Sequence, residues 1–368
     1  MGQSRRKSIF LVLLIFEVCA HVRSAFTASS LPPERRGITA LSAAAKRNDD
    51  ASICCSMHTT RLVTASGKPV CRYGLGGAAR SVQPESLPIK YRDLLSQQYP
   101  DVAPFYFYYN PHRYPEFLSG VAKSFSDEED RKDMFIASGG DRSPASLDRR
   151  LSDALAYSGG DYLDAFVLEY VCPYELSSDN KQLSGELQQA IEHVHKMKKD
   201  GKVRYVMAST HSHLVGSVLA SATLDDASPA FDALMLRYNM SHKIAAESMS
   251  LPNALQHNIP VLAFTTTRWN RLQNAAHMGG EVSTSDCIQF ALHHPAVEAV
   301  LHSARDEEEL DEALLPLFSA SSSGQSSWIS KEECERFRDW GSDEMEFNHE
   351  DAFDEYPEEM EFVDAAIG

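Results

Sequence analysis

The stretch SGELQQAIEHVHKMKKDGKVRYVMAS, residues 184–209, holds a helix pattern followed directly by a strand pattern. Its first part places apolar residues three or four positions apart, on one helical face: Leu187, Ile191, Val194 and Met197. Gly201 is a helix stop signal, and the run 203–209 after it is suited to a buried strand. Because parallel strands need a crossover connection that is usually a helix, the stretch predicts one unit of a parallel α/β sheet.

The same alternation recurs along the rest of the chain. Helical patterns separate eight strand-like runs: 71–77, 105–109, 134–138, 165–171, 203–209, 231–238, 260–266 and 297–304. Eight such units predict an α/β fold, a (β/α)8 or TIM barrel over residues 61–320. A doubly wound open sheet is the alternative, but its usual G-x-G-x-x-G does not follow the first strand, which carries only GLGG at 74–77.

The charge of the chain is concentrated at its C-terminus. The 368 residues carry a formal net charge of -17, and residues 331–368 alone hold 15 acidic and 3 basic side chains. The rest of the chain lacks the basic excess of a general nucleic-acid-binding protein, so that class is excluded. We interpret residues 321–368 as a linker and acidic tail, which is either disordered or a docking segment for a basic protein partner.

Residues 1–25 resemble a signal peptide. Basic residues at positions 5–7 precede the apolar run 9–16, which is too short to cross a bilayer and is followed by Glu17. We therefore expect no membrane anchor once this segment is removed.

Residues 26–60 are rich in Ser, Thr, Ala and Arg and poor in acids, as is typical of a transit peptide. With Phe26 just after Ala25, the leader resembles the bipartite leaders of algae with complex plastids, which implies a plastid (chloroplast) location. A purely secretory leader, and with it a secreted binding protein, is the alternative. The seven cysteines form no Cys-x-x-Cys pair and favour reduced thiols, which counts against secretion.

Glu169 interrupts the apolar run 165–171. An isolated carboxylate in an apolar interior is costly, and in a barrel of this type the chemistry lies at the C-terminal ends of the strands. We therefore expect Glu169 to face the cleft at a strand end, with pairing to Arg113 or to a backbone donor as the structural alternative. The fourteen histidines show no metal-binding spacing, so no metal site is predicted.

Several segments together resemble the aldo-keto reductase superfamily, in the order and spacing of that family, from about Gly67 to Leu315. They are SLDRRLSDALAYSGGDYLDAFVLEYV (146–171), KKDGKVRYVMAST (198–210), LMLRYNMSH (234–242), NIPVLAFTT (258–266) and HSARDEEELDEAL (302–314). The resemblance implies a barrel that binds NADP(H) and transfers hydride to a small carbonyl substrate or a conjugated double bond.

The resemblance also assigns a cofactor cleft. It implies that Ser209 holds the nicotinamide amide beside Thr210, that Phe264 stacks on the nicotinamide ring, that Arg305 meets the 2′-phosphate and that Glu312 lies near the adenine. Two strand-end residues complete the set of candidate cofactor-binding residues: Gly76 and Ser303. Three of the usual amide residues are replaced, by Met235, Glu309 and Ala313.

The family's catalytic tetrad is largely absent by residue type. Gly139 stands at the lysine position, Glu169 at the histidine position, and Tyr108 or Tyr109 at the aspartate position, while Tyr114 matches the tyrosine. We therefore expect either an oxidoreductase in which Tyr114 or Glu169 donates the proton, or a non-catalytic nucleotide- or metabolite-binding barrel that acts as a scaffold or sensor.

Overall fold

The computed structural model describes residues 58–77, 82–109, 113–140, 143–177, 182–273, 282–319 and 328–347. All of these belong to the second of the two units into which the chain divides, Ile53–Gly368. The predicted signal peptide, 1–25, residues 26–57 of the predicted transit segment 26–60, and the tail beyond 347 lie outside the described residues.

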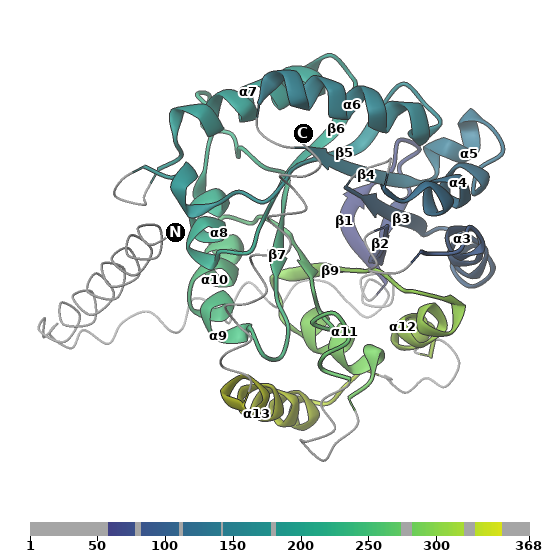
Figure 1. Ribbon diagram of the computed structural model, residues 1–368, viewed down its shortest axis with the longest axis vertical. Coiled ribbons are helices and arrows are strands. Elements are labelled where there is room, and N and C mark those ends of the chain that lie inside the picture. The colour runs from purple at the N-terminus through teal and green to yellow at the C-terminus, as the bar shows by residue number, and fades with distance from the viewer. Residues whose placement is uncertain are drawn as a thin grey trace, which may run out of the picture. The chain divides into compact units, whose positions relative to one another are not determined.

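Eight parallel strands form a closed barrel (Figure 1). The strands are β2 (Pro69–Gly76), β3 (Ala103–Tyr108), β4 (Phe135–Gly140), β5 (Leu163–Leu168), β6 (Val203–Thr210), β7 (Ala233–Arg237), β8 (Val261–Phe264) and β9 (Val297–His302). Each pairs with the next, and β9 pairs in parallel with β2, with Tyr73 opposite Val300. The predicted (β/α)8 barrel and its eight strand runs are thus confirmed.

An additional strand, β1 (Thr59–Val63), precedes the barrel and was not predicted from the sequence. It forms an antiparallel hairpin with β2 through a turn in which Gly67 has a φ of 93°. Leu62 of β1 packs with the side chains inside the barrel, and Arg204, near the start of β6, donates to the backbone oxygen of Val63 at 2.9 Å. The hairpin therefore closes the N-terminal end of the barrel.

Helices surround the barrel in the order expected of βα units (Figure 1). They are α3 (Ser86–Gln98), α4 (Pro115–Lys123), α5 (Glu128–Lys132), α6 (Pro144–Ser158), α7 (Gly185–Lys199), α8 (His213–Ser221), α9 (Lys243–Ala245), α10 (Leu251–Gln256), α11 (Thr284–His293), α12 (Glu307–Ser319) and α13 (Lys331–Phe347), with short turns η2 (Pro173–Glu175) and η3 (Ala246–Ser250). Helix α7 begins as its sequence predicts, because the side chain of Ser184 accepts a hydrogen bond from the backbone N–H of Leu187.

Helix α13 occupies the first part of the predicted acidic tail. Ile329, Cys334 and Phe337 pack into the buried layer, and the Nη1 of Arg338 donates to Glu247 at 2.7 Å. The disordered alternative for the tail is therefore wrong for residues 331–347. A basic partner for the remaining tail residues stays a prediction.

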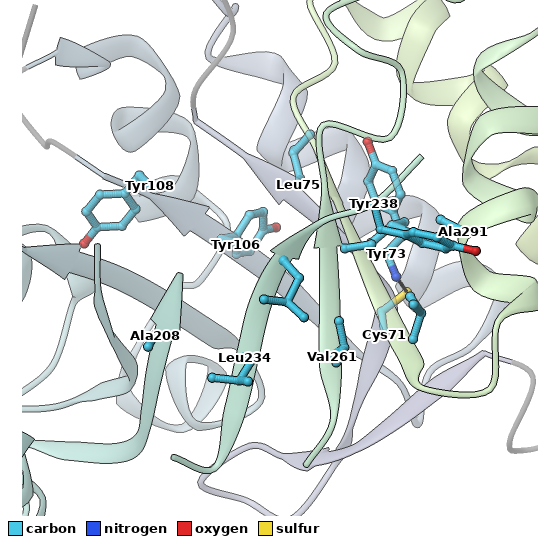
Figure 2. Packing of buried hydrophobic residues seen from close by; sticks show 14 of the residues in the cluster. Cys71, Tyr73, Leu75, Tyr106, Tyr108, Ala208, Leu234, Tyr238, Val261 and Ala291 are labelled. Carbon is cyan, nitrogen blue, oxygen red and sulfur yellow. Dashed lines mark hydrogen bonds between the residues drawn. The ribbon is translucent and has the colours of Figure 1, made fainter. Parts of the chain in front are cut away.

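The strands alternate between two hydrophobic clusters. The outer cluster lies between strands and helices and holds Tyr73, Tyr106 and Tyr108 (Figure 2). The inner cluster fills the barrel with the intervening residues, among them Phe107 and Val167. Because successive side chains of a strand point to opposite faces, this alternation decides which strand-end residues reach the barrel mouth.

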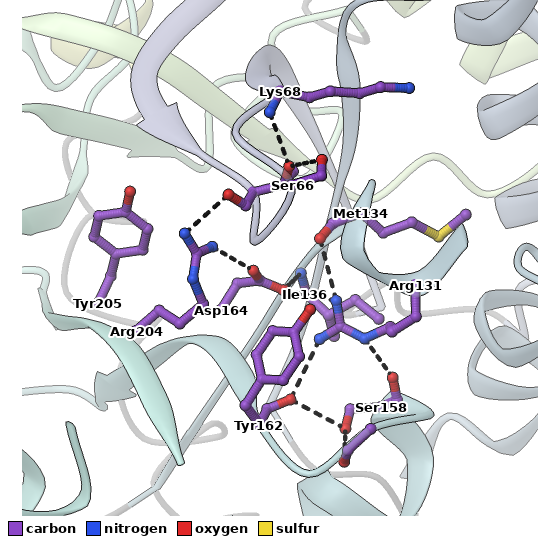
Figure 3. A network of polar contacts seen from close by, with 12 residues as sticks. Ser66, Lys68, Arg131, Met134, Ile136, Ser158, Tyr162, Asp164, Arg204 and Tyr205 are labelled. Carbon is purple, nitrogen blue, oxygen red and sulfur yellow. Dashed lines mark hydrogen bonds and ion pairs between the residues drawn. The ribbon is translucent and has the colours of Figure 1, made fainter. Parts of the chain in front are cut away.

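A buried ionic network lies near the N-terminal ends of β5 and β6 (Figure 3). We call Arg131, Asp164 and Arg204 the floor network. The carboxylate of Asp164 accepts from Arg131 at 2.9 Å, from Arg204 at 2.8 Å and from the backbone N–H of Ile136 at 3.0 Å. The side chains of Arg131 and Asp164 are both 0% exposed. Buried charges require a partner, and these two residues provide one for each other.

Candidate functional site

The inner face of the barrel continues into a ring of polar and aromatic residues at the C-terminal strand ends. The inner cluster ends with Phe107, Ala137, Val167, Met207 and Met235. Side chains of a strand alternate between its two faces, so the residue two positions after each of these also points inward. These next inward-facing residues are Tyr109, Gly139, Glu169, Ser209 and Arg237. These five residues define the mouth of the barrel, where this fold carries its chemistry.

Glu169 follows directly after β5 and leans over Gly139 of the neighbouring strand. A β-carbon at Gly139 would lie 2.7 Å from Oε1 and 2.8 Å from Cγ of Glu169, closer than real side chains approach. The space above Gly139 is therefore occupied by the glutamate side chain. The two residues that the resemblance assigns to the lysine and histidine positions are therefore in direct contact.

Tyr109 is the phenol beside Glu169. Tyr108 faces outward, where its hydroxyl donates to the backbone oxygen of Ala154 at 3.1 Å, so Tyr109 is the inward residue at the family's aspartate position. Burial raises the pKa of Tyr109 well above its usual value, and the neighbouring Tyr170 and Glu169 raise it further. Tyr109 is therefore a neutral phenol that can donate a hydrogen bond.

Four rings cross the mouth from β3 to β8 and form an aromatic arc, defined as Tyr109, Tyr170, His211 and Phe264. Tyr109 stacks on Tyr170 with centroids 5.5 Å apart, Tyr170 stacks on His211 at 5.4 Å, and His211 meets Phe264 edge-on at 4.9 Å. The sequence reading missed Tyr170 and His211 as site residues. For His211 a signal existed, since it is the next inward position after Ser209.

Ser209 positions the arc. Its hydroxyl oxygen accepts from the backbone N–H of Tyr170 at 2.9 Å, and its carbonyl accepts from the N–H of Val171 at 2.8 Å. These bonds hold Tyr170 with a φ of 49°, a left-handed conformation that a large residue adopts only when its surroundings impose it. Thr210 faces the other way, and its hydroxyl donates to the backbone oxygen of Val171 at 2.7 Å.

The mouth also carries a cation that the sequence reading did not single out. Arg237 ends β7 on the inward face, two residues after Met235. Burial and then the charge of Arg237 lower the pKa of His211 to about 3. The alternation of inward-facing and outward-facing side chains along β7 could have predicted that Arg237 faces inward. That prediction requires the bounds of the strand, which the sequence alone does not define.

The predicted cofactor residues near β2 and β9 lie close together. A β-carbon at Gly76 would lie 2.7 Å from the hydroxyl oxygen of Ser303, so the glycine permits this close approach. The amide nitrogen of Gln83 donates to the backbone oxygens of Gly76 at 2.9 Å and of Ala304 at 2.8 Å. Gln83 was not predicted, and it holds the two strand ends in place.

Arg305 is engaged by the acidic residue one turn further along. Glu309 accepts from the Nε of Arg305 at 2.9 Å and from its backbone N–H at 2.8 Å. Hydrogen bonds from His302 and Arg305 outweigh burial and lower the pKa of Glu309 to about 2, so this carboxylate is ionised. Glu312 instead accepts from the backbone N–H of Thr284 at 2.8 Å and thereby joins α12 to the start of α11.

Tyr114, the predicted tyrosine acid, precedes helix α4 and packs against the outer cluster. The guanidinium of Arg113 lies 5.8 Å from the centre of its ring. The phenol that the structure places beside Glu169 is Tyr109, so the two predicted catalytic residues belong to different layers of the barrel.

Within the described part of the chain, no group of three or more His, Cys, Asp and Glu side chains could hold a metal ion. Over the same residues, no helix is long and apolar enough to cross a membrane.

A sequence model of the aldo/keto reductase family matches residues 95–278, which is half of the chain. The match covers the segments from helix α3 to the loop after β8. No curated protein sequence matches the chain.

Solved structures share the fold at low sequence identity. An aldo/keto reductase from Klebsiella pneumoniae in complex with NADP and acetate is 17% identical, with a TM-score of 0.56, and the match covers 77% of this chain and 95% of that one. One from Klebsiella pneumoniae in complex with NADPH is 16% identical, with a TM-score of 0.55 and the same coverage. A thermostable aldo-keto reductase in complex with the inhibitor epalrestat is 17% identical, with a TM-score of 0.52 over 76% of this chain and 98% of that one.

Proposed function

The chain belongs to the aldo/keto reductase family, and on that premise we propose that it is an NADP(H)-dependent oxidoreductase that reduces a small carbonyl compound or a conjugated double bond. The observation that carries this proposal is the position of Glu169 near the neutral phenol of Tyr109 at the mouth, with Ser209 on the neighbouring strand β6 and Arg237 on β7. The mouth therefore holds a proton donor, Glu169, and a cation, Arg237, although neither is of the residue type that the family's catalytic tetrad uses.

The side chains at the mouth fit the nicotinamide end of the dinucleotide. The hydroxyl oxygen of Ser209 accepts a hydrogen bond from the backbone N–H of Tyr170, and its hydrogen, which interacts with Tyr109, can turn to an amide oxygen when the nicotinamide binds. Phe264 is inward-facing on β8 and offers an aromatic surface. Arg305 is 56% exposed and offers a guanidinium to a phosphate, with Glu309 as its competitor. The NADPH and NADP bound by the Klebsiella pneumoniae proteins support the same assignment.

When bound, the reduced cofactor supplies the hydride. Glu169 donates the proton to the substrate oxygen or carbon, and Tyr109 orients the substrate by a hydrogen bond, because its raised pKa keeps it protonated. Tyr170 and His211 restrict the entry of water, since their stacked rings lie across the mouth.

A non-catalytic barrel is the second candidate, and one observation favours it. Glu169 occupies the space above Gly139 where a β-carbon would lie, so a lysine cannot return to that position without moving the glutamate. The mouth would then bind a nucleotide or metabolite and report its presence without turning it over.

We place the protein in the plastid on the strength of its leader composition. The first 57 residues lie outside the described structure, so this proposal rests on the sequence alone. A fluorescent fusion of residues 1–60 tests it, and export of the fusion from the cell would instead support the secretory alternative.

The enzymatic proposal is tested by binding and then by turnover. Titration with NADPH is expected to quench tryptophan fluorescence, and Glu169→Gln is expected to lower kcat on a carbonyl panel by about 10²-fold or more with NADPH binding unchanged. Glu192→Gln, an exposed glutamate of α7, is the control and should match the parent. Absence of NADPH binding at millimolar cofactor removes the oxidoreductase proposal, whereas an unchanged rate in Glu169→Gln removes the role of Glu169.

A further inference from the structure

Four side chains after β6 and β7 form a second polar group at the mouth. We call His211, His213, Arg237 and His242 the cationic cluster. Strands β6 and β7 are neighbours, with Thr210 opposite Leu236, so their C-terminal extensions start side by side. None of the four residues is among the cofactor positions assigned by resemblance.

The three imidazoles are held in place by contacts around the cluster. His211 stacks on Tyr170, with centroids 5.4 Å apart. The Nδ1 of His213 lies 2.9 Å from the hydroxyl oxygen of Ser250, and the Nδ1 of His242 lies 3.2 Å from the Oδ1 of Asn239. These contacts fix the rings before any ligand arrives, which reduces the entropy cost of binding.

One polar atom of the cluster points to a ligand directly. His213 is 6% exposed, and its Nε2 is buried without a hydrogen-bond partner in the structure. Buried polar atoms in folded proteins are nearly always hydrogen-bonded. A buried ring nitrogen without a hydrogen-bond partner therefore indicates that a ligand binds there.

The electrostatics of the cluster indicate the sign of that group. Burial and then the charge of Arg237 lower the pKa of His213 to about 4 and that of His242 to about 3, and the same two causes act on His211. Arg268, which is 0% exposed, also acts on His242. The imidazoles are thus neutral at neutral pH, and they lie within the electrostatic reach of a cation.

We propose that the cationic cluster binds the anionic group, a carboxylate or a phosphate, of the substrate that is reduced at Glu169. An arginine presents a planar fork that matches both groups, and a neutral imidazole can donate one N–H to their oxygens. This inference rests on the proposed function, because it assigns the substrate class of that same mouth.

The distance of the cluster from Glu169 suits a substrate that carries both a carbonyl and an anionic group. Arg237 lies on β7, two strands from the Glu169 strand β5 and two strands from β9, whose loop carries Arg305. Two strand spacings amount to about 10 Å. A small aldehyde or ketone with a carboxylate or phosphate at its far end spans this distance from proton donor to cation.

The test measures anion binding to the full chain by calorimetry, with inorganic phosphate and succinate as probes and uncharged succinamide as the matched neutral compound. We expect saturable binding of at least one anion and none of succinamide, and the anion that binds distinguishes a phosphate from a carboxylate substrate. Arg237→Met is expected to weaken that binding at least tenfold. Arg149→Met, which removes an exposed arginine of α6, is the control and should bind as the parent does.

A second variant covers the case in which Arg237→Met loses native circular dichroism. His242→Gln is then expected to weaken anion binding about threefold or more. The proposal is overturned if neither anion binds saturably, or if the folded cluster variants bind the anion as tightly as Arg149→Met does. An NADPH titration of the same proteins separates the two claims: anion binding without NADPH binding removes the oxidoreductase proposal and leaves the anion site.

Discussion

The two ends of the barrel arrange charge in opposite ways. At the N-terminal end, the floor network surrounds the single carboxylate of Asp164 with two guanidinium groups and a backbone N–H, all within 3.0 Å. At the mouth, burial and then the charge of Arg237 hold down the pKa values of the three imidazoles of the cationic cluster. The floor pairs its buried charges with each other, whereas the imidazoles of the mouth are kept neutral near a cation.

This difference separates stability from function. A buried ion pair contributes little net free energy when intact, but the loss of one partner leaves an uncompensated charge. Buried imidazoles that are held neutral near a guanidinium group serve binding, because a ligand of opposite sign to that cation can accept their hydrogen bonds. We therefore expect substitutions in the floor to change the free energy of unfolding and substitutions in the mouth to change ligand binding.

The largest expected effect follows from Asp164→Asn. The substitution leaves the fully buried Arg131 without its counter-charge, which costs about 3–5 kcal/mol of unfolding free energy in urea titrations. Asp148→Asn, which breaks the surface contact with His193, is the control, and it should cost about 1 kcal/mol or less. If the two variants lose similar amounts, the floor is not the stabilising end of the barrel.

The strands of the barrel could be predicted from the sequence, whereas strand β1 could not. The strand runs are apolar over several residues, so β5 and β6 were recognisable from their residues alone. Glu169 was recognisable because a carboxylate stands out in such a run. The hairpin strand β1 was missed because TTRLV is short and only partly apolar.

The mouth was harder to predict because side-chain direction depends on register. A shift of one residue turns every side chain of a strand to the other face, so the choice between Tyr108 and Tyr109 needed the observed strand. The contact between Glu169 and Gly139 joins neighbouring strands, and sequence spacing does not define it. Arg237 was missed for the same reason, since it is the last inward residue of its strand.

A second prediction concerns pH. The folded pKa values of His211, His213 and His242, about 3, 4 and 3, lie below the unfolded value near 6.5. As pH falls below 6.5, the unfolded chain therefore takes up protons first, so their contribution to stability is complete above pH 6.5 and is lost toward the folded pKa values. Each imidazole changes the unfolding free energy by up to about 1.4 kcal/mol per pH unit in that window.

The measurement is the unfolding free energy between pH 5.5 and 6.5, where Glu309 adds little slope because it is ionised almost completely in both the folded and the unfolded chain. His213→Gln is expected to reduce the slope, and His257→Gln, at an exposed histidine of the surface, to leave it unchanged. Equal slopes in the parent and in His213→Gln would mean that the mouth does not hold its imidazoles neutral, and the contrast with the histidine-free floor network would fail.

The smallest expected effect is at the rim of the mouth, where Glu309 reproduces the internal pairing of the floor. Glu309→Gln removes the negative charge that competes for Arg305, yet the glutamine oxygen still accepts from the backbone N–H of Arg305. Because Arg305 is more than half exposed, solvent screening limits the gain to about 1 kcal/mol, or roughly fivefold tighter NADPH binding. NADH lacks the 2′-phosphate and serves as the matched ligand. Tighter NADPH binding with unchanged NADH binding places the phosphate at Arg305, whereas equal changes for the two dinucleotides would assign Glu309 a purely structural role like that of Asp164.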